Sequence, residues 1–368
     1  MARNFSGIGV YSEYLLENLS LLDRENEYFC FVRNDYSRKP DLGDNFELIP
    51  CQAPPLSYYS VLGFHRKVER LKPDFLHSLF PIIPVLYNGK LLVTVHDLQP
   101  LLMREWTGKR FYPIKKMYDL FYHWMYHAVF NRANWLIADS QATKDSITAI
   151  DPELAHKAIV IHPGISQDCF TEPDQAFFNS LKSNHALSDR YILYVGSTRP
   201  NKNIPRMLAA FARLLKGDPG FCDIQFVMVL TPDRFLTDVR AAIAHHKLGK
   251  NVKILEPVTD IEKNALYRNA SLLFFATKHE GFGFPVLEAQ AQGCPVVAAN
   301  HASLPEVSGG SALLSDPDNE ADMAECLRRA LQDENLRQTL VQAGAENVKR
   351  FFWTDTARKV MEIYYHLM

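Results

Sequence analysis

Residues 271–293 read "SLLFFATKHEGFGFPVLEAQAQG" and combine a short apolar run, a glycine-rich turn and the beginning of a helix. The apolar run is typical of a buried strand, and Pro285 suits the first position of a helix because its missing N–H has no partner there. Ligands of open α/β sheets bind outside the carboxyl ends of strands, where this turn lies. Free N–H groups at a helix N-terminus favour an anion such as a diphosphate. The stretch therefore predicts a strand–turn–helix unit of an α/β fold that faces an anionic ligand.

Two glutamates, Glu280 and Glu288, flank this turn. A carboxylate that faced the diphosphate itself would be repelled, so we expect each glutamate to bind neutral hydroxyls on one side of it. A molecule with hydroxyls on both sides of a diphosphate is a nucleotide sugar. The alternative is a plain strand–turn–helix connection with surface carboxylates, because glycine-rich turns are common.

Short apolar runs alternate with helical patterns along the whole chain, which predicts parallel sheets with crossover helices. The expected strands are 28–32, 46–49, 74–78, 90–96, 135–139, 158–162, 191–196, 224–230, 252–255, 271–277 and 295–299. A chain of 368 residues exceeds the size of one core. The segment 162–175 has the proline, glycine and polar residues of a linker. We expect two doubly wound, Rossmann-like domains with a cleft between them.

The composition narrows the class of protein. With 47% hydrophobic and 22% charged residues and a net charge of −2, the chain has an ordinary globular composition and not that of a nucleic-acid binder. Its six cysteines are scattered without a C-x-x-C pair, which argues against a disulfide framework or a zinc site. The same cysteine pattern favours a reducing, cytoplasmic location. The sequence shows neither an 18-residue apolar run nor a signal peptide, so we expect any membrane contact to be peripheral.

The segment "EGFGFPVLEAQAQGCPVV" (280–297) resembles the E-x7-E signature of retaining glycosyltransferases of family 4, the group 1 glycosyltransferases, which have the GT-B fold. The resemblance continues in "SGIGVYSEYLLENL" (6–19), "TVHDLQPL" (94–101), "ADSQATKDSI" (138–147), "YILYVGSTRPNKNIPRMLAAF" (191–211) and "SLPEVSGGSALLSDP" (303–317). It implies that Glu280 contacts the transferred sugar and Glu288 the ribose. It also implies an acceptor-side domain at 1–165, completed by a terminal helix at 352–368, and a nucleotide-sugar domain at 166–351. The donor-binding residues implied along the signature are Gly281, Phe282, Gly283, Phe284, Pro285 and Leu287.

Further site residues come from loops that follow other strands. Lys202, in "GSTRPNKN" (196–203), is the best cation for the diphosphate, and a point charge there would stabilise the leaving group. Relatives usually carry an arginine directly before this lysine, where this chain has Asn201, and Arg199 is expected to take its place. The alternative for Lys202 is a solvated lysine ahead of a helix that starts near Pro205.

In the first half of the chain, the resemblance assigns His96 a hydrogen bond to the donor sugar or the acceptor. A lone histidine after a strand is otherwise more often structural. Gly7 and Gly9 resemble a glycine loop that approaches the donor phosphates and the acceptor. Relatives have an apolar strand ahead of this loop, where Met1 directly precedes Ala2 and Arg3 here. We expect either a start downstream of that strand or a first sheet without it.

The segment 104–131 combines aromatic and cationic residues. A core-facing helical stripe is expected at Ile114, Met117, Phe121, Trp124 and Ala128, with Tyr118, Tyr122 and Tyr126 on a second stripe. The favoured interpretation is a helix packed on two sides with solvated lysines. The alternative is a surface for an anionic membrane or a lipid-diphosphate acceptor, helped by Arg104, Lys109, Arg110, Lys115 and Lys116.

These observations predict a retaining glycosyltransferase of surface-polysaccharide synthesis in the cytoplasm, with a peripheral position on the inner face of the cell membrane as the alternative location. The expected donor is GDP-mannose, with UDP- or ADP-sugars as alternatives, and the acceptor is a saccharide or a polyprenyl-diphosphate-linked saccharide. Glu280, Lys202 and His96 form the expected catalytic set, with no cofactor and no metal. The alternatives are a nucleotide-sugar 2-epimerase of the same architecture and a non-catalytic nucleotide-sugar-binding protein.

Overall fold

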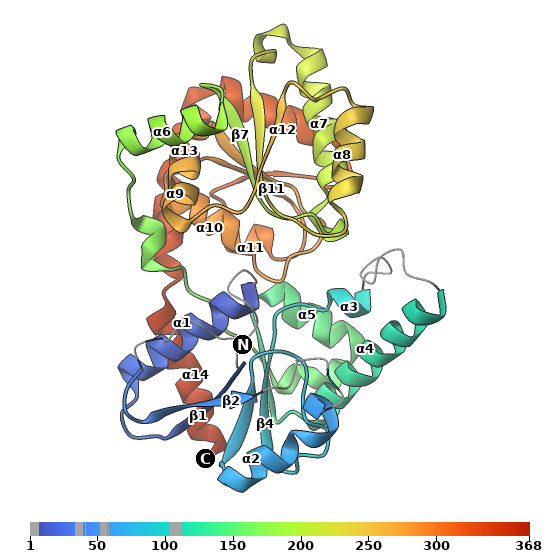
Figure 1. Ribbon diagram of the computed structural model, residues 1–368, viewed down its shortest axis with the longest axis vertical. Helices are drawn as coiled ribbons and strands as arrows, with labels where there is room; N and C mark the ends of the chain where they lie inside the picture. Colours follow the sequence, from blue (N-terminus) through green and yellow to red (C-terminus); the bar gives the residue numbers. More distant parts are fainter. Residues whose placement is uncertain (1–6, 34–39, 41, 52–56, 58, 103–111) are drawn as a thin grey trace. The chain divides into compact units, whose positions relative to one another are not determined.

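The structure is a computed structural model, and it describes residues 7–33, 40, 42–51, 57, 59–102 and 112–368 (Figure 1). The chain forms two compact units. Unit 1 contains residues Met1–Gly164 and Phe351–Met368, and unit 2 contains Ile165–Arg350. The eleven strands expected from the sequence are all present within a few residues of their predicted bounds.

Unit 2 is built on one parallel sheet of six strands in the order β12-β11-β10-β7-β8-β9. The strands are β7 (Tyr191–Ser197), β8 (Gln225–Thr231), β9 (Val252–Leu255), β10 (Leu272–Phe275), β11 (Val296–Ala299) and β12 (Leu313–Ser315). The chain runs outward from β7 through β8 to β9, then crosses back to β10 and continues the other way. The order of the strands therefore reverses between β7 and β10, and the loops after these two neighbours meet at the switch point.

Helices cover both faces of this sheet (Figure 1). They are α6 (Gln175–His185), α7 (Ile204–Gly217), α8 (Leu236–His245), α9 (Asp260–Asn269), α10 (Phe284–Ala291), α11 (Leu304–Ser308), α12 (Glu320–Gln332) and α13 (Glu334–Asn347). One group is formed by α7 with α8 and α12, and another by α10 with α9 and α13. Strand β10 is buried along its whole length between them, as expected for the middle of a doubly wound sheet.

Unit 1 contains two parallel sheets in its described residues, β1-β2 and β3-β4-β5-β6. The strands are β1 (Tyr28–Arg33), β2 (Phe46–Cys51), β3 (Phe75–Ser78), β4 (Lys90–Val95), β5 (Trp135–Ala138) and β6 (Ala158–Val160). The helices are α1 (Gly7–Leu22), α2 (His65–Leu71), α3 (Gln99–Leu102), α4 (Tyr112–Arg132), α5 (Gln141–Ile150) and α14 (Trp353–Leu367). Residues 1–6, where an additional strand was in question, lie outside the described residues.

The terminal helix α14 ties the two sheets of unit 1 together and packs on α1. The Tyr364 ring lies 6.3 Å from the ring of Tyr28 in β1 and 4.9 Å from that of Phe75 in β3. Its hydroxyl is 2.8 Å from Nδ1 of His77. Where the chain returns to unit 1, a Cβ atom at Gly164 would overlap the backbone of Phe352 and Trp353. The outgoing and returning segments of the chain therefore lie against each other at this glycine.

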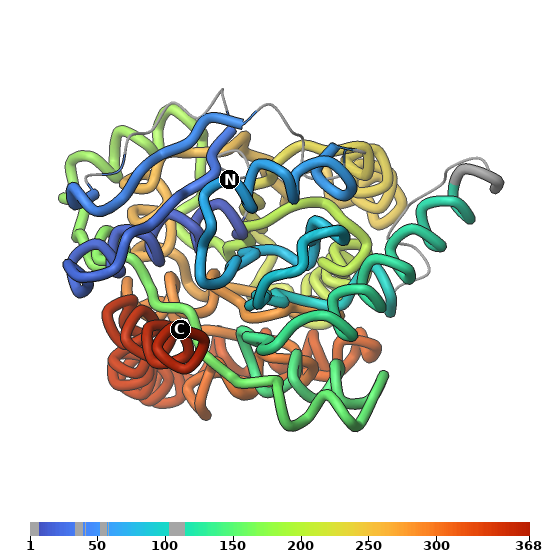
Figure 2. Tube along the Cα trace, turned by 90° about the horizontal axis from the view of Figure 1, so that it is seen from below, coloured from blue at the N-terminus to red at the C-terminus, as the bar shows by residue number. Residues whose placement is uncertain are grey.

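Helix α4 corrects the predicted stripe. Met117 is 62% exposed and Trp124 is 48% exposed, so these residues do not face the core. The buried face carries Met125, Tyr126, Val129 and Phe130, and Phe121 and Ala128 of the predicted stripe pack partly against the same core. Figure 2 shows the first turns of α4 projecting from the rest of unit 1. The favoured interpretation of a helix packed on two sides is therefore wrong for the N-terminal part of α4. The predicted cationic residues Arg104, Lys109 and Arg110 lie outside the described residues.

Candidate functional site

The loops after β7 and β10 bring Lys202 and Glu280 together, although the two residues are 78 positions apart in the chain. Nζ of Lys202 donates to Oε1 of Glu280 at 2.7 Å and to Oε2 at 2.9 Å. The side chains keep 17% and 11% of their surface exposed. The ammonium also lies 5.7 Å from the centre of the Phe275 ring. The two residues therefore form a bidentate ion pair that solvent reaches.

Asn201 joins the same two loops through both its side chain and its backbone. Its Nδ2 donates to the carbonyl of His279 at 3.0 Å, and its own carbonyl accepts from the N–H of Lys278 at 2.8 Å. The residue is only 3% exposed. Asn201 thus fixes the spacing between the Lys202 loop and the Glu280 loop, a role that the sequence did not reveal.

The side chain of Ser303 contacts the backbone of the turn between β10 and α10. Its buried hydroxyl lies 3.0 Å from the carbonyl of Glu280 and 2.6 Å from that of Phe282. Gly283 has φ of 119°, a conformation that L side chains rarely adopt. A Cβ atom there would also come within 2.7 Å of Leu304 Cδ2. The glycine is required because the chain turns sharply here into α10.

Helix α10 begins at Phe284, so Pro285 occupies its second position and not the first as predicted. Phe282 and Leu287 are buried, which limits any contact of these two residues with a donor to their backbone atoms. Gly281, Phe284 and Pro285 are half-buried, and Arg199 is exposed at the beginning of the Lys202 loop. The residues predicted in the loop after β7 and in the loop after β10 therefore lie at the same edge of the sheet, at the carboxyl ends of these two strands.

Glu288 lies on α10 and is held by two side chains of α9. Its Oε1 accepts from Nζ of Lys263 at 3.0 Å, and its Oε2 accepts from the hydroxyl of Tyr267 at 2.9 Å. Sequence reasoning missed both partners. Two features of the sequence could have indicated them. Lys263 and Tyr267 are four residues apart, so they lie on one face of a helix. The capping box of Thr259 and Glu262 marks the start of that helix, α9.

His96 follows β4 in unit 1, and both of its ring nitrogens have partners. Nδ1 is 2.6 Å from Oδ2 of Asp139, and Nε2 is 2.9 Å from the carbonyl of Leu79. Both partners are acceptors, so the pair of hydrogen bonds requires a doubly protonated ring. Burial alone lowers the pKa of His96, but the Asp139 carboxylate and these bonds raise it above its ordinary value. A bond from this ring to a sugar would require Nε2 to leave Leu79.

Other predicted residues of unit 1 are also placed. Gly7 and Gly9 lie in the first turn of α1, so the expected glycine loop is helical from Gly7 onward. Asp97 caps the next turn by accepting from the N–H of Gln99 at 3.1 Å. Ser140 caps α5 by accepting from the N–H of Thr143 at 3.1 Å.

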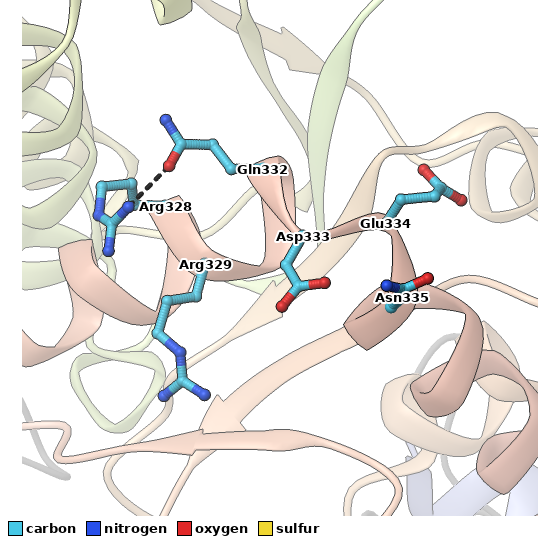
Figure 3. Close-up of a pocket in the computed structure, with 6 residues that line it drawn as sticks. All are labelled: Arg328, Arg329, Gln332, Asp333, Glu334 and Asn335. Atoms are coloured by element: carbon cyan, nitrogen blue, oxygen red, sulfur yellow. Dashed lines mark hydrogen bonds between the residues drawn. The ribbon is translucent and has the colours of Figure 1, made fainter.

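A cavity at the junction of α12 and α13 lies apart from these loops (Figure 3). It is lined by Arg328, Arg329, Gln332, Asp333, Glu334 and Asn335. Arg328 donates to Oε1 of Gln332 at 2.6 Å, and Asp333 caps α13 by accepting from the N–H of Leu336 at 2.9 Å. None of the predicted site residues lines this cavity.

Within residues 7–33, 40, 42–51, 57, 59–102 and 112–368, no group of three or more histidine, cysteine or acidic side chains is arranged to hold a metal ion. Over the same part of the chain, no helix has both the length and the apolar character needed to cross a membrane.

Comparison with known proteins identifies both halves of the chain. Residues 5–168 match the model of Glycosyltransferase Family 4, and residues 177–347 match that of Glycosyl transferases group 1. The serotype-specific mannosyltransferase WbdA of Escherichia coli is 27% identical over 76% of this chain, and the match spans 34% of WbdA. The O-antigen chain mannosyltransferase B of Escherichia coli is 25% identical over 65% of this chain and 62% of that protein. The chain thus spans about a third of the length of the WbdA proteins that it matches.

Solved structures agree on the fold. HepE of Anabaena, solved in complex with UDP and glucose, has a TM-score of 0.74 at 17% identity and covers 100% of this chain and 98% of its own. The sucrose-phosphate synthase of Thermosynechococcus elongatus has a TM-score of 0.73 at 20% identity, with coverage of 98% and 94%. With the strand order of unit 2 and the two family models, these matches lead to one conclusion: the chain belongs to glycosyltransferase family 4, the group 1 glycosyltransferases, and has the GT-B fold.

Proposed function

We propose that the chain transfers a hexosyl group from a nucleotide sugar to a hydroxyl of a saccharide acceptor, with retention of the anomeric configuration, in surface-polysaccharide synthesis. The observation that carries the proposal is the pairing of Lys202 with Glu280 at the switch point of unit 2. A cation and a carboxylate at one end of the sheet, next to the beginning of α10, suit a diphosphate and the hydroxyls of the sugar attached to it.

The proposed reaction exchanges one bond for another at the anomeric carbon. The bond to the diphosphate oxygen breaks, and a bond to the acceptor oxygen forms on the same face of the sugar. The proton of the acceptor hydroxyl passes to the departing diphosphate. Lys202 and the N–H groups of α10 stabilise the charge that develops on the leaving group, in place of a metal ion. Glu280 binds hydroxyls of the transferred sugar, and Glu288 binds the ribose.

Mannose is the proposed hexose and GDP-mannose the proposed donor. Support comes from WbdA and from O-antigen chain mannosyltransferase B, which are named as mannosyltransferases. A lipid-linked saccharide is the proposed acceptor, and the exposed face of α4 is the proposed contact with the membrane. That face presents Met117, Leu120 and Trp124, which are 62%, 60% and 48% exposed. Lys116 is exposed next to them.

Thermal unfolding with GDP, UDP and ADP in the presence of a chelator tests the proposal. We expect one of these nucleotides, at about 100 times its dissociation constant, to add about 2.7 kcal/mol to the stability of the protein. Lys202→Met should reduce this gain. Lys278→Met is the matched control, because Lys278 pairs with Asp318 at 2.9 Å and not with Glu280. A stabilisation that appears only when magnesium or manganese is added would contradict the metal-free proposal.

A further inference from the structure

The carboxylate of Glu288 has a donor on each of its oxygens. Nζ of Lys263 is 3.0 Å from Oε1, and the hydroxyl of Tyr267 is 2.9 Å from Oε2. The side chains of Lys263 and Glu288 are 19% and 16% exposed, whereas Tyr267 is fully buried. The plane of the carboxylate is therefore fixed from the α9 side, while part of the Glu288 side chain remains accessible to solvent.

Both partners stay protonated and act only as donors to the carboxylate. Burial, and then the Glu288 carboxylate, raise the pKa of Tyr267 well above its ordinary value. Burial by itself lowers the pKa of Lys263, but Glu288 and Asp260 raise it above that of a free lysine. Since Lys263 remains an ammonium, it also neutralises Glu288 and limits its repulsion of a nearby diphosphate.

The number of acceptor sites that remain on Glu288 is set by these two donors. An ionised carboxylate offers about four lone-pair sites, two on each oxygen. Lys263 and Tyr267 each occupy one site, on different oxygens, so about one site per oxygen remains. Two neighbouring acceptors in a fixed plane match two adjacent hydroxyl donors, and a single hydroxyl would use only one of them.

We propose that Lys263 and Tyr267 are positioning residues that orient the Glu288 carboxylate toward a vicinal diol, the 2′- and 3′-hydroxyls of the nucleotide ribose. The inference rests on the proposed function in assigning the ribose to Glu288. It adds that discrimination between ribose and deoxyribose depends on α9, through two side chains that do not themselves touch the nucleotide.

A purely structural role for these contacts gives a different expectation. If Lys263 and Tyr267 served only to join α9 to α10, their loss would lower stability without changing which nucleotide the site prefers. The informative quantity is therefore the ratio of affinities for a nucleotide with and without the diol. A general weakening of the fold affects both ligands alike and cancels in this ratio.

The experiment is calorimetry of the full chain with GDP and with 2′,3′-dideoxy-GDP, or with the corresponding UDP or ADP pair where wild type binds that base more tightly. We expect wild type to prefer the ribonucleotide by roughly tenfold or more, because the diol donates to a charged acceptor. Tyr267→Phe should reduce the preference to about threefold or less, with the dideoxy affinity changed less than about twofold. Lys263→Met should reduce the preference as well, which gives a second variant if the first is poorly folded.

Tyr191→Phe is the matched control. The Tyr191 hydroxyl is also fully buried and also bonds to α9, donating to the Leu266 carbonyl at 2.6 Å. It has no contact with Glu288, so its loss should leave the preference at the wild-type value. A reduction as large as that of Tyr267→Phe would overturn the positioning role and attribute the effect to α9 packing in general.

The ribonucleotide preference of Glu288→Gln distinguishes a failure of the positioning role from a failure of the proposed ribose contact. If Glu288→Gln loses the preference while Tyr267→Phe and Lys263→Met keep it, the positioning role is wrong and the ribose assignment stands. If wild type binds both nucleotides equally, or binds none of the three, the ribose assignment of the proposed function fails and the inference fails with it.

Discussion

Each glutamate of the E-x7-E pair has its own lysine. Glu280 pairs with Lys202, and Glu288 pairs with Lys263. The sequence predicted the two glutamates and the position of Lys202, because they lie in or near glycine-rich turns after strands. It did not predict the pairs, because the partners are 78 and 25 positions apart and meet only through the order of the strands and helices. Each lysine therefore neutralises the charge of its glutamate, which limits the repulsion between the carboxylate and a nearby anion.

The Lys202 ion pair leads to a prediction for Glu280. If Lys202 binds the diphosphate of the proposed donor, the Glu280 carboxylate competes with the nucleotide for the same ammonium. Glu280→Gln removes the competing charge, and we expect it to bind the free nucleoside diphosphate about two- to fivefold more tightly, since a partly exposed pair is worth up to about 1 kcal/mol. Turnover should fall steeply because the sugar loses its acceptor. Calorimetry together with transfer assays measures both effects.

Glu288→Gln provides the comparison, because it should weaken binding of the same diphosphate. Opposite directions for two substitutions of the same chemistry exclude a general effect of losing one negative charge. Unchanged or weaker nucleotide affinity in Glu280→Gln would show that Lys202 does not need to leave its partner.

Two histidines of unit 1 predict a stability maximum near neutral pH. The pKa of His96 is raised above 6.5, so its contribution is complete below pH 6.5 and is lost as the pH rises through the folded-state value. Burial, and then the charge of His96, lower the pKa of His77 from 6.5 to about 3. The contribution of His77 is therefore lost as the pH falls below 6.5 toward 3.

Thermal unfolding between pH 4 and 9 measures this effect. Above the maximum, we expect wild type to lose stability and His96→Gln to show a much flatter dependence, because the Asp139 pair is gone. An equally steep decline in both proteins above pH 7 would contradict the assignment of a protonated His96.

At the scale of secondary structure, the sequence predicted which elements form better than it predicted which face of an element is buried. Eleven strands were found because each is a short apolar or aromatic run between turn residues. Strand β12 (Leu313–Ser315) was missed because its apolar run is limited to residues 312–314 between two serines, whereas the equally short β6 lies within the longer apolar run 158–161. In α4 the aromatic and apolar residues are so dense that two faces look equally buried, and the predicted stripe mixes residues that pack on the core, Phe121 and Ala128, with the exposed Met117 and Trp124. Packing against unit 1 settles which face is covered.

The exposed face of α4 predicts a contact with anionic membranes. If Met117 and Trp124 insert between lipids, the double substitution Met117→Ser/Trp124→Ser should reduce partitioning to anionic vesicles by roughly tenfold or more, because buried apolar side chains each contribute about 1.5–3 kcal/mol. Replacing Lys115 and Lys116 by glutamate should weaken binding in low salt and have less effect in high salt. Vesicle co-sedimentation measures both changes.

Leu21→Ser is the matched control for the apolar pair, because Leu21 is 68% exposed but lies on α1. Equal losses from Leu21→Ser and from the α4 variant would point to nonspecific adsorption. Wild-type protein that stays in the supernatant would contradict the membrane proposal.

At the scale of the whole molecule, unit 1 depends on residues from the far end of the chain. Helix α14 buries Trp353, Val360, Ile363, Tyr364 and Leu367 within unit 1. A chain that ends at Arg350 loses several buried side chains worth about 1.5–3 kcal/mol each, which approaches the whole stability of a typical domain. We expect residues 7–164 of this truncated chain to be digested rapidly by protease, while residues 165–350 resist digestion and still bind nucleotide.

Limited proteolysis with mass spectrometry identifies the resistant segment, and the intact chain is the control. A truncated chain whose first 164 residues remain as resistant as those of the intact chain would show that α14 is dispensable for unit 1.

Gly164 has one further consequence. Since its backbone lies against Phe352 and Trp353, the chain departs for unit 2 and comes back at a single spot. Unit 2 is thus an inserted cassette, and exchanging residues 165–350 for those of a relative needs two neighbouring junctions and cuts no strand or helix of the recipient. Recombination at these two junctions would replace unit 2, which carries the proposed donor site, and would leave unit 1 unchanged. Such an exchange requires that Gly164 be kept, because any side chain at this position would push the outgoing and returning segments apart.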